Sequence, residues 1–491
     1  MTNKTVNVKI FIFLAITILV FISIYFVFGN LDGISVGDEL LVKCSYISLF
    51  VWLFCVITCL INKTAFNNLY FLYLIMYGIF IFGYIICKYV IGYVDNSAFD
   101  LNEYVTIDYL AKGSVLSIYC LLGMHIGHLL KIIRSKNNIE DKILENTDNR
   151  IRYDIMKKLA IIFLIFSVPF VLTSTIDDFR LASIYGYQGV YSNQKVGLAS
   201  ISSKIEPFFY IGLLMLIGSY KNEEKKAKKV LIFIILYNFI LMFLGSRGLN
   251  ILRILVALVF YHYKIKKFKL KNFIVIGAVC MIILLFIPII KSFRKYGLKE
   301  WLPNINEIIE ETMEDNILLN SISEMGGAIF PTASSIEYVD INGEYKYGTT
   351  YLYGFATLIP NFGTTEHSAL SKSDTQAMVS KYFGLSFGGS VVQEAYINFG
   401  WFSWIFMIIL GYIITGISDR FINSKDPIVY PLFCVFMVNF LWTIRNNIMP
   451  GLCRDILWYL IPIYILYRLI LSKKEKEIFK VGQSKHINSS I

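Results

Sequence analysis

Long apolar blocks alternate with short polar segments along almost the whole chain. The blocks lie near residues 9–28, 40–61, 68–92, 110–133, 159–176, 205–220, 230–244, 249–263, 272–290, 391–416, 428–446 and 455–471. A helix needs about 20 apolar residues to cross the roughly 30 Å hydrocarbon core of a bilayer. Inside that core the backbone must satisfy its own hydrogen bonds, which favours helices. The pattern predicts an all-α polytopic membrane protein with about twelve transmembrane helices.

Some of these blocks allow a second interpretation. Block 9–28 follows Lys4 and Lys9, as the apolar part of a signal peptide would. It is longer than a typical signal sequence and no small-residue cleavage site follows, so we interpret it as a membrane helix. Blocks 230–244 and 249–263 are joined by a very short turn and form either two crossings or one re-entrant hairpin.

The distribution of basic residues predicts the orientation of the helices. With a cytoplasmic N-terminus, the segments on that side are 1–8, 62–67, 134–158, 221–229, 264–271, 417–427 and 472–491. Lysines are concentrated in several of them, whereas 29–39 and 93–109 on the other side contain acids but no lysine or arginine. Short cytoplasmic loops carry an excess of Lys and Arg, so both termini are predicted to be cytoplasmic.

One outer segment, residues 291–390, is much longer than the others. It divides the chain into helices in 1–290, the loop itself, helices in 391–471 and a basic cytoplasmic tail in 472–491. Loops of such length are uncommon unless they are functional or structured. Apolar residues recur at helical spacing over 301–325, so we expect a partly helical extracytoplasmic loop.

Composition agrees with a membrane protein and excludes several classes of function. Hydrophobic residues make up 56% of the 491 residues and charged residues only 16%, against about 25% in soluble domains. The formal net charge is +11, but membrane orientation explains the basic residues, so no nucleic-acid partner is expected. The eight cysteines lie mostly within apolar blocks. No P-loop, nucleophile elbow or metal-binding motif is present, so no metal, cofactor or ATP is expected.

Arginines on the outer side are scarce, and they are the main candidates for ligand binding. They are Arg180 at the end of a membrane block, Arg247 in a glycine-flanked turn, Arg294 at the start of the long loop, and Arg445 and Arg454 beside the last outer turn. Guanidinium groups bind phosphate oxygens bidentately and keep their charge. We expect these arginines to hold a lipid-linked diphosphate, with Arg247 the strongest candidate because backbone amides of its turn could also face an anion.

Structural roles compete with this interpretation for several basic residues. Arg445 and Arg454 could instead reach the membrane interface as anchors. Arg253 lies inside an apolar block, where it either belongs to the site or pairs with a carboxylate in the bundle. Lys88 also lies in an apolar block, and we expect it to extend to the interface.

Two residues are candidates for the general base. Glu394 is the first choice, because it lies where the chain re-enters the membrane and an intramembrane carboxylate is a functional candidate. His367 is the second, because it is the only histidine in an outer loop and titrates near neutral pH. Without a catalytic role, Glu394 would be an acid at a helix end near the interface, and His367 would be an exposed loop histidine. The adjacent Asp177 and Asp178 are better explained as a solvated helix end than as a metal site.

Three short segments and the overall layout carry a resemblance to a known family. The segments are Leu244-Gly245-Ser246-Arg247-Gly248 before a helix, Tyr347-Gly348-Thr349-Thr350-Tyr351 before Ile359-Pro360-Asn361, and Gln393-Glu394-Ala395-Tyr396-Ile397-Asn398-Phe399-Gly400. With the predicted helices and the large outer loop, they make residues 150–450 similar to the Wzy-type polymerases of O-antigen and capsular oligosaccharide repeat units.

The resemblance implies an activity and roles for the candidate residues. Such glycosyltransferases move a growing glycan from undecaprenyl diphosphate to the non-reducing end of a new lipid-linked repeat unit, without a nucleotide sugar or a metal. The arginines named above would hold the diphosphate, and Glu394 or His367 would deprotonate the acceptor hydroxyl. The implied partners are undecaprenyl-diphosphate-linked oligosaccharides, the bilayer and a polysaccharide chain-length regulator, at the outer face of the cytoplasmic membrane.

Three other functions remain open at the level of sequence. A ligase of similar architecture would differ only in its acceptor. A flippase for lipid-linked oligosaccharide would have related halves, short loops and a charged central cavity, and these features are not evident here. A metal-dependent glycosyltransferase would need acids in the first outer loop, where Asp32 and Asp38 do not form a tight pair.

Overall fold

Helices account for all the regular secondary structure of the described chain. The computed structural model describes residues 3–28, 38–93, 104–136, 149–192, 198–244, 247–269, 303, 316–359, 368–384, 388–446 and 449–488. Eight helical segments in these ranges are long and apolar enough to cross a membrane, and Val429–Arg445 is a shorter apolar helix. The predicted all-α polytopic membrane protein is therefore confirmed. Block 272–290 lies outside the described residues, and the count of about twelve crossings stays a prediction.

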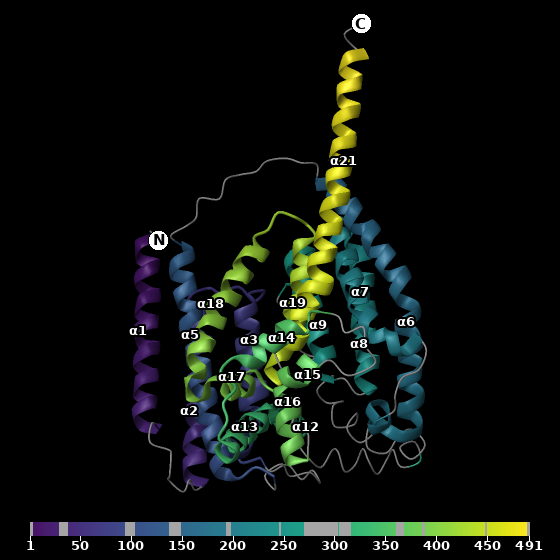
Figure 1. Ribbon diagram of the computed structural model, residues 1–491. Helices are drawn as coiled ribbons and strands as arrows, with labels where there is room; N and C mark the ends of the chain where they lie inside the picture. Colours follow the sequence, from purple (N-terminus) through teal and green to yellow (C-terminus); the bar gives the residue numbers. More distant parts are fainter. Residues whose placement is uncertain are drawn as a thin grey trace.

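The helices form a bundle with two distinct ends (Figure 1). α1 (Asn3–Phe28) begins at the end beyond which α21 (Ile461–Asn488) extends, and we call this the terminal end. α13 (Ile329–Asn342) and α17 (Val391–Phe399) lie at the opposite end, which we call the loop end.

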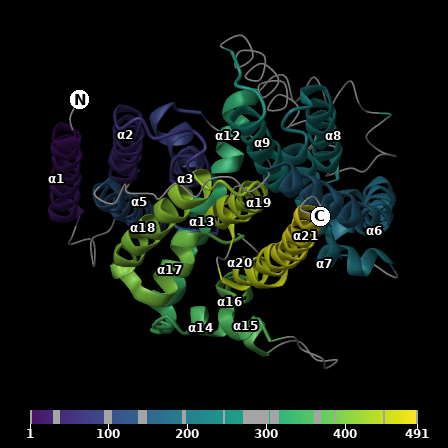
Figure 2. The same ribbon diagram turned by 90° about the horizontal axis from the view of Figure 1, so that it is seen from above.

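One side of the bundle is built around α5 (Ile107–Lys136). α5 packs against α1, α2 (Asp38–Ile61) and α18 (Ser403–Ile422), as the view along the bundle shows (Figure 2). A further helical segment over Leu69–Val90 completes this side. Its parts are α3 (Leu69–Tyr77), the π-helix η1 (Gly78–Phe82), α4 (Gly83–Ile85) and the π-helix η2 (Ile86–Val90).

The other side consists of helices in sequence order, each packed against the next. They are α6 (Asn149–Ser192), α7 (Leu198–Ser219), α8 (Glu224–Phe243) and α9 (Arg247–Lys264). α19 (Val429–Trp442) lies between the two sides and contacts α3, α7 and α9. The chain then continues through η6 (Thr443–Arg445), α20 (Met449–Arg454) and the π-helix η7 (Asp455–Leu460) into α21.

The α8–α9 pair is long enough for two membrane crossings. α8 has 20 residues and α9 has 18, so they are about 30 and 27 Å long. Lys266, just after α9, places its Nζ 2.7 Å from Oε1 of Glu224 at the start of α8. The two helices therefore run antiparallel. Neither is among the eight helical segments that are long and apolar enough to cross a membrane, so the choice between two crossings and one re-entrant hairpin stays a prediction.

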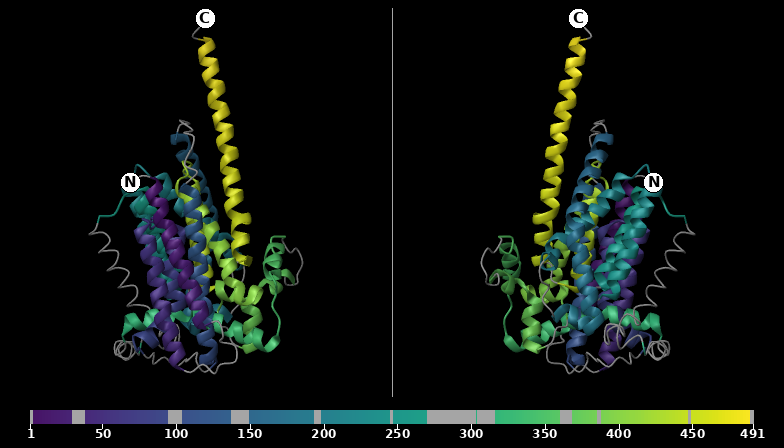
Figure 3. Two further views of the ribbon diagram at one scale, coloured as in Figure 1. Left: turned by 90° about the vertical axis from the view of Figure 1, so that its left-hand side faces the viewer. Right: turned by 90° about the vertical axis from the view of Figure 1, so that its right-hand side faces the viewer.

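The described part of the long loop contains several short helices. They are α12 (Ile317–Met325), η4 (Gly326–Ala328), α13, α14 (Thr349–Ala356), α15 (Ser368–Ser373) and α16 (Thr375–Phe383), followed by α17 and η5 (Gly400–Phe402). Side-chain caps start two of them: Asn316 Oδ1 accepts the Leu319 N–H, and Asp374 Oδ1 accepts the Ala377 N–H. α14 and α15 project from one side of the bundle (Figure 3), where α14 contacts α20.

Glycines allow α5 and α18 to pack with their backbones in contact. A Cβ at Gly127 would collide with the carbonyl oxygen of Ile408, and a Cβ at Gly411 would collide with that of Met124. Helix association inside a bilayer relies on such close packing, because lipid provides no hydrophobic driving force between helices. The α5–α18 contact therefore makes this side of the bundle rigid.

A fully buried histidine pair joins α5 to three neighbouring helices. His125 has its Nε2 2.7 Å from Oγ1 of Thr58 in α2 and its Nδ1 2.6 Å from the hydroxyl of Tyr70 in α3. His128 has its Nδ1 2.9 Å from Oγ1 of Thr415 in α18. Buried polar groups are costly unless they are hydrogen-bonded, so these contacts fix how α2, α3 and α18 sit around α5.

We expect Gly411→Ala to destabilise the protein, because its Cβ would meet backbone rather than a movable side chain. Overpacking of this kind costs about 1–3 kcal/mol. The midpoint of thermal unfolding in detergent should fall. Gly451→Ala is the matched control, because no atom lies within 4 Å of a Cβ built there. Equal midpoints for the two variants would contradict the proposed close packing.

Candidate functional site

Hydrogen bonds dock the chain around α14 onto α17 at the loop end. The Gly348 N–H donates to Oδ1 of Asn398 at 3.0 Å, and Asn398 Nδ2 donates to Oγ1 of Thr350 at 2.6 Å. The Lys346 N–H donates to the carbonyl of Ile397 at 2.8 Å. Two of the segments that resemble the polymerase family, 347–351 and 393–400, are thus bound directly to each other.

Glu394 is fully buried in the first turn of α17. A capping box starts this helix: the Gln393 N–H donates to Ser390 Oγ, and the Ser390 N–H donates to Gln393 Oε1. Burial and, after it, the charge of Glu394 raise the pKa of the Tyr351 hydroxyl in α14. Glu394 also acts electrostatically on Cys453 in α20, and α20 contacts α14.

Two of the predicted arginines lie in elements that pack against α17 or against the docked α14. Arg445 ends η6, which contacts α17, and its Cζ is 5.6 Å from the ring centroid of Phe80. Arg454 ends α20, directly after Cys453, and its Cζ is 5.7 Å from the ring centroid of Trp458. Arginine over an aromatic ring is an attractive contact. The structure thus brings Glu394, Arg445 and Arg454 to one end of the bundle.

Of the other predicted residues, some are described by the structure and some lie outside its described part. Arg180 is exposed in the second half of α6, a helix that packs against α7 and α21. α9 begins at Arg247, but the side chain of Arg247 lies outside the described part of the chain. Arg294 and His367 also lie outside the described residues. Lys88 donates a hydrogen bond to the Tyr84 hydroxyl at 3.1 Å and lies near the ring of Tyr84, and its extension to the membrane interface stays a prediction.

A charged cavity of about 210 Å³ lies between α7, α8, α9, α19 and η7. Arg253 is six residues, or about 9 Å, from the start of α9 at the loop end, so the cavity belongs to that half of the bundle. Polar and apolar residues contribute about equally to its wall. Its polar lining consists of Ser203, Glu206, Tyr210, Arg253, Asn439 and Asp455.

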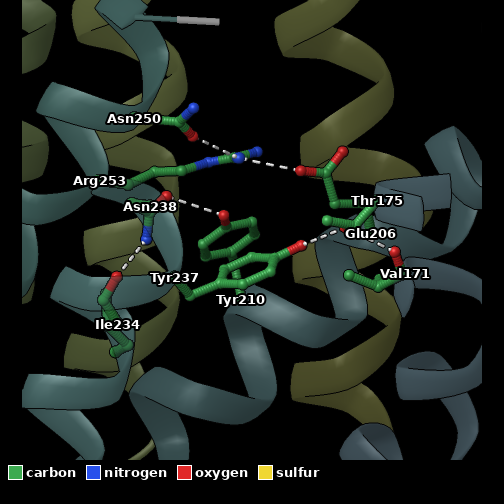
Figure 4. A network of polar contacts seen from close by, with 9 residues as sticks. All are labelled: Val171, Thr175, Glu206, Tyr210, Ile234, Tyr237, Asn238, Asn250 and Arg253. Carbon is green, nitrogen blue, oxygen red and sulfur yellow. Dashed lines mark hydrogen bonds and ion pairs between the residues drawn. The ribbon is translucent and has the colours of Figure 1, made fainter. Parts of the chain in front are cut away.

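The Arg253 guanidinium is held by three neighbours (Figure 4). Its Nη1 lies 2.9 Å from Oε1 of Glu206 in α7 and 3.3 Å from Oδ1 of Asn250. Its Cζ lies 3.7 Å from the ring centroid of Tyr210. Arg253 therefore pairs with a carboxylate inside the bundle, as the structural interpretation predicted, and it also lines the cavity.

Further hydrogen bonds fix the surroundings of this ion pair. The Tyr210 hydroxyl donates to Oδ1 of Asn238 in α8 at 2.8 Å, and Asn238 Nδ2 donates to the Ile234 carbonyl at 2.7 Å. Elsewhere in the lining, Asn439 Nδ2 donates to Oδ2 of Asp455 at 2.8 Å. Asp455 opens η7, and π-helical turns are frequent at functional sites.

Sequence reasoning missed the acidic wall of this cavity. Glu206 and Asp455 lie at the start of the apolar blocks 205–220 and 455–471, and an acid in such a block is a signal of function. Asn439 lies well inside block 428–446. The three residues are far apart in the sequence, so only the folded chain shows that they share a cavity.

The fold and the loop end define a class of protein. It is a polytopic helical membrane protein with arginines, a buried carboxylate and a charged cavity at the end that carries its longest loop. The family model described as O-antigen polysaccharide polymerase Wzy matches residues 9–476. The chain therefore belongs to the O-antigen polysaccharide polymerase Wzy family, which confirms the resemblance seen in the sequence. No curated protein and no solved structure matches the chain.

We expect Arg253→Gln and Glu206→Gln each to lower the free energy of unfolding, because each leaves one charge without its partner. The loss should be about 1–3 kcal/mol, the usual cost of an unsatisfied buried group. It should stay below the roughly 3–5 kcal/mol of a fully buried pair, because the Glu206 side chain is 33% exposed. The double variant should lose less than the sum of the single losses. Additive losses in thermal unfolding would show that the pair is not coupled.

Proposed function

We propose that the chain polymerises undecaprenyl-diphosphate-linked oligosaccharide repeat units into O-antigen or capsular polysaccharide. The reaction would be glycosyl transfer at the outer face of the cytoplasmic membrane. The observation that supports this most is the common location of Arg445, Arg454, Glu394 and the charged cavity at the loop end. Cationic groups for a diphosphate and carboxylates for a sugar hydroxyl are the groups that this reaction needs.

The proposed step breaks the bond between the first sugar of the growing glycan and its diphosphate. The acceptor hydroxyl forms a new glycosidic bond at that carbon and gives its proton to Glu394, or to His367. Undecaprenyl diphosphate leaves with its charge stabilised by Arg247, Arg445 and Arg454, and Arg294 could add to them. The docked chain around α14 would cover the site and exclude water, because hydrolysis is the competing reaction.

In this proposal the loop end faces outward and both termini are cytoplasmic. Lysines support the orientation, because they follow α9 and α7 at the terminal end and recur in α21. An exclusively cytoplasmic enzyme could use nucleotide sugars, whereas a site at the outer face must take its energy from the lipid-linked donor.

Ser371→Cys and Ser472→Cys test the orientation. Ser371 is exposed in α15, and Ser472 is exposed in α21 towards the terminal end. A membrane-impermeant maleimide should label Ser371→Cys on intact spheroplasts and label Ser472→Cys only after permeabilisation. The described native cysteines are buried, which limits background labelling. The opposite pattern of labelling would contradict the proposed outer-face site.

Arg247→Ala and Arg445→Ala test the diphosphate role in cells that lack the native gene. Without the gene, the glycan should stop at single repeat units, and the wild-type gene should restore the ladder of lengths. Each variant should lower the turnover about 10²–10³-fold, the usual effect of removing one group that stabilises developing charge. The ladder on a gel should then be absent or greatly shortened.

Arg468→Ala is the matched control for these arginine variants. Arg468 lies in α21, and its Nη1 is 3.8 Å from Oδ2 of Asp426 beside the start of α19, far along the chain from the loop-end groups. It should leave the ladder unchanged at equal abundance in the membrane. Repeat units that accumulate on the cytoplasmic face in the deletion strain would instead identify a flippase and overturn the proposal.

A further inference from the structure

The cavity beside Arg253 has room for one sugar ring. Its volume is about 210 Å³, whereas a cavity of roughly 150 Å³ is large enough for benzene. A six-membered ring that carries hydroxyl groups therefore fits. A ring at the end of a glycan needs space for a neighbour on one side only, so a cavity of this size suits the end of a chain.

The charges of the lining favour a neutral ligand over a phosphate. Glu206 and Asp455 contribute two negative charges, and Arg253 contributes one positive charge. Because Arg253 already pairs with Glu206 at 2.9 Å and Asp455 interacts electrostatically with Arg253 and Arg454, the positive charges beside the cavity are already balanced by carboxylates. A diphosphate group placed here would compete with these carboxylates for the guanidinium groups, whereas sugar hydroxyls can donate to carboxylates and accept from a guanidinium.

The hydrogen-bonding groups of the cavity come from four helical elements. Asn439 and Asp455 belong to α19 and η7, and Arg253 and Glu206 belong to α9 and α7. A carboxylate can accept several hydrogen bonds, and Asn439 supplies one of them to Asp455. A few polar groups among apolar side chains are typical of sites that orient a small ligand.

We propose that this cavity binds the terminal, non-reducing sugar of the acceptor glycan. Asp455 and Asn439 contact some of its hydroxyl groups, and the Arg253–Glu206 pair contacts others. This assignment rests on the proposed polymerase function and adds to it a subsite beside Arg454, one of the arginines that would hold the diphosphate. The residues that line the cavity would then determine which terminal sugar the protein accepts.

Binding of the free repeat-unit oligosaccharide to the full chain in nanodiscs tests the subsite. The probe is released from its lipid by mild acid, so it carries no diphosphate. In saturation-transfer NMR, the protons of its terminal non-reducing sugar should receive the strongest signal. Asp455→Ala and Asn439→Ala should each weaken binding about tenfold or more, as expected for the loss of a hydrogen bond that involves a charged group.

Asp154→Ala is the matched control. Asp154 pairs with Lys158 at 3.0 Å and Lys474 at 3.7 Å, and this ion pair lies in α6 and α21 rather than in the cavity. The control should bind the oligosaccharide as the wild-type chain does. Unchanged binding in both cavity variants, or displacement of the oligosaccharide by inorganic pyrophosphate, would overturn the assignment.

A second measurement avoids variants that remove a buried charge. Ser203 lines the cavity and is exposed, so Ser203→Cys should react with a small thiol reagent more than the wild-type chain does. The oligosaccharide should protect this cysteine, and inorganic pyrophosphate should not. If the oligosaccharide does not reduce the labelling of this cysteine, the proposed subsite is contradicted, even if cells make the polymer. A different result is that the oligosaccharide protects the cysteine although the protein forms no polymer. That result would show that the cavity binds a glycan, but it would overturn the acceptor role.

Discussion

A guanidinium group inside a membrane bundle must be matched by a negative charge and by hydrogen-bond acceptors. Arg253 meets this requirement through Glu206, Asn250 and the ring of Tyr210. The requirement ties α9 to α7, and the hydrogen bond from Tyr210 to Asn238 extends it to α8. These contacts fix the positions of α7, α8 and α9 along one another. The polar cavity lies beside the ion pair as a result of this arrangement.

The opposite side of the bundle supplies rigidity in a different way. α5 and α18 approach closely because Gly127 and Gly411 have no Cβ, and the buried pair His125 and His128 connects α5 to its neighbours. α17 and η5 lead directly into α18, so the helix that carries Glu394 is continuous with this rigid pair. α19 then lies between the two sides and contacts both. The ends of rigid helices, rather than the long loop alone, therefore position the loop-end groups.

The sequence was sufficient to predict the fold class, because a bilayer allows few structures and apolar blocks of sufficient length mark most helices. It also placed Glu394 at the start of a helix and two loop-end arginines near each other. It could not predict the cavity, because Glu206, Arg253 and Asp455 come from three distant helices. It did not reveal the histidine pair either, because the partners of His125, Thr58 and Tyr70, lie in other apolar blocks. Contacts between remote helices depend on packing, which hydropathy along the chain does not encode.

The central claim is that this member of the Wzy family joins lipid-linked repeat units at the loop end. The most direct measurement uses the purified chain in proteoliposomes, supplied only with undecaprenyl-diphosphate-linked repeat units and no nucleotide. The account predicts glycans that lengthen in steps of one repeat unit, with undecaprenyl diphosphate released for each bond formed. Repeat units that cross the bilayer without being joined would contradict it.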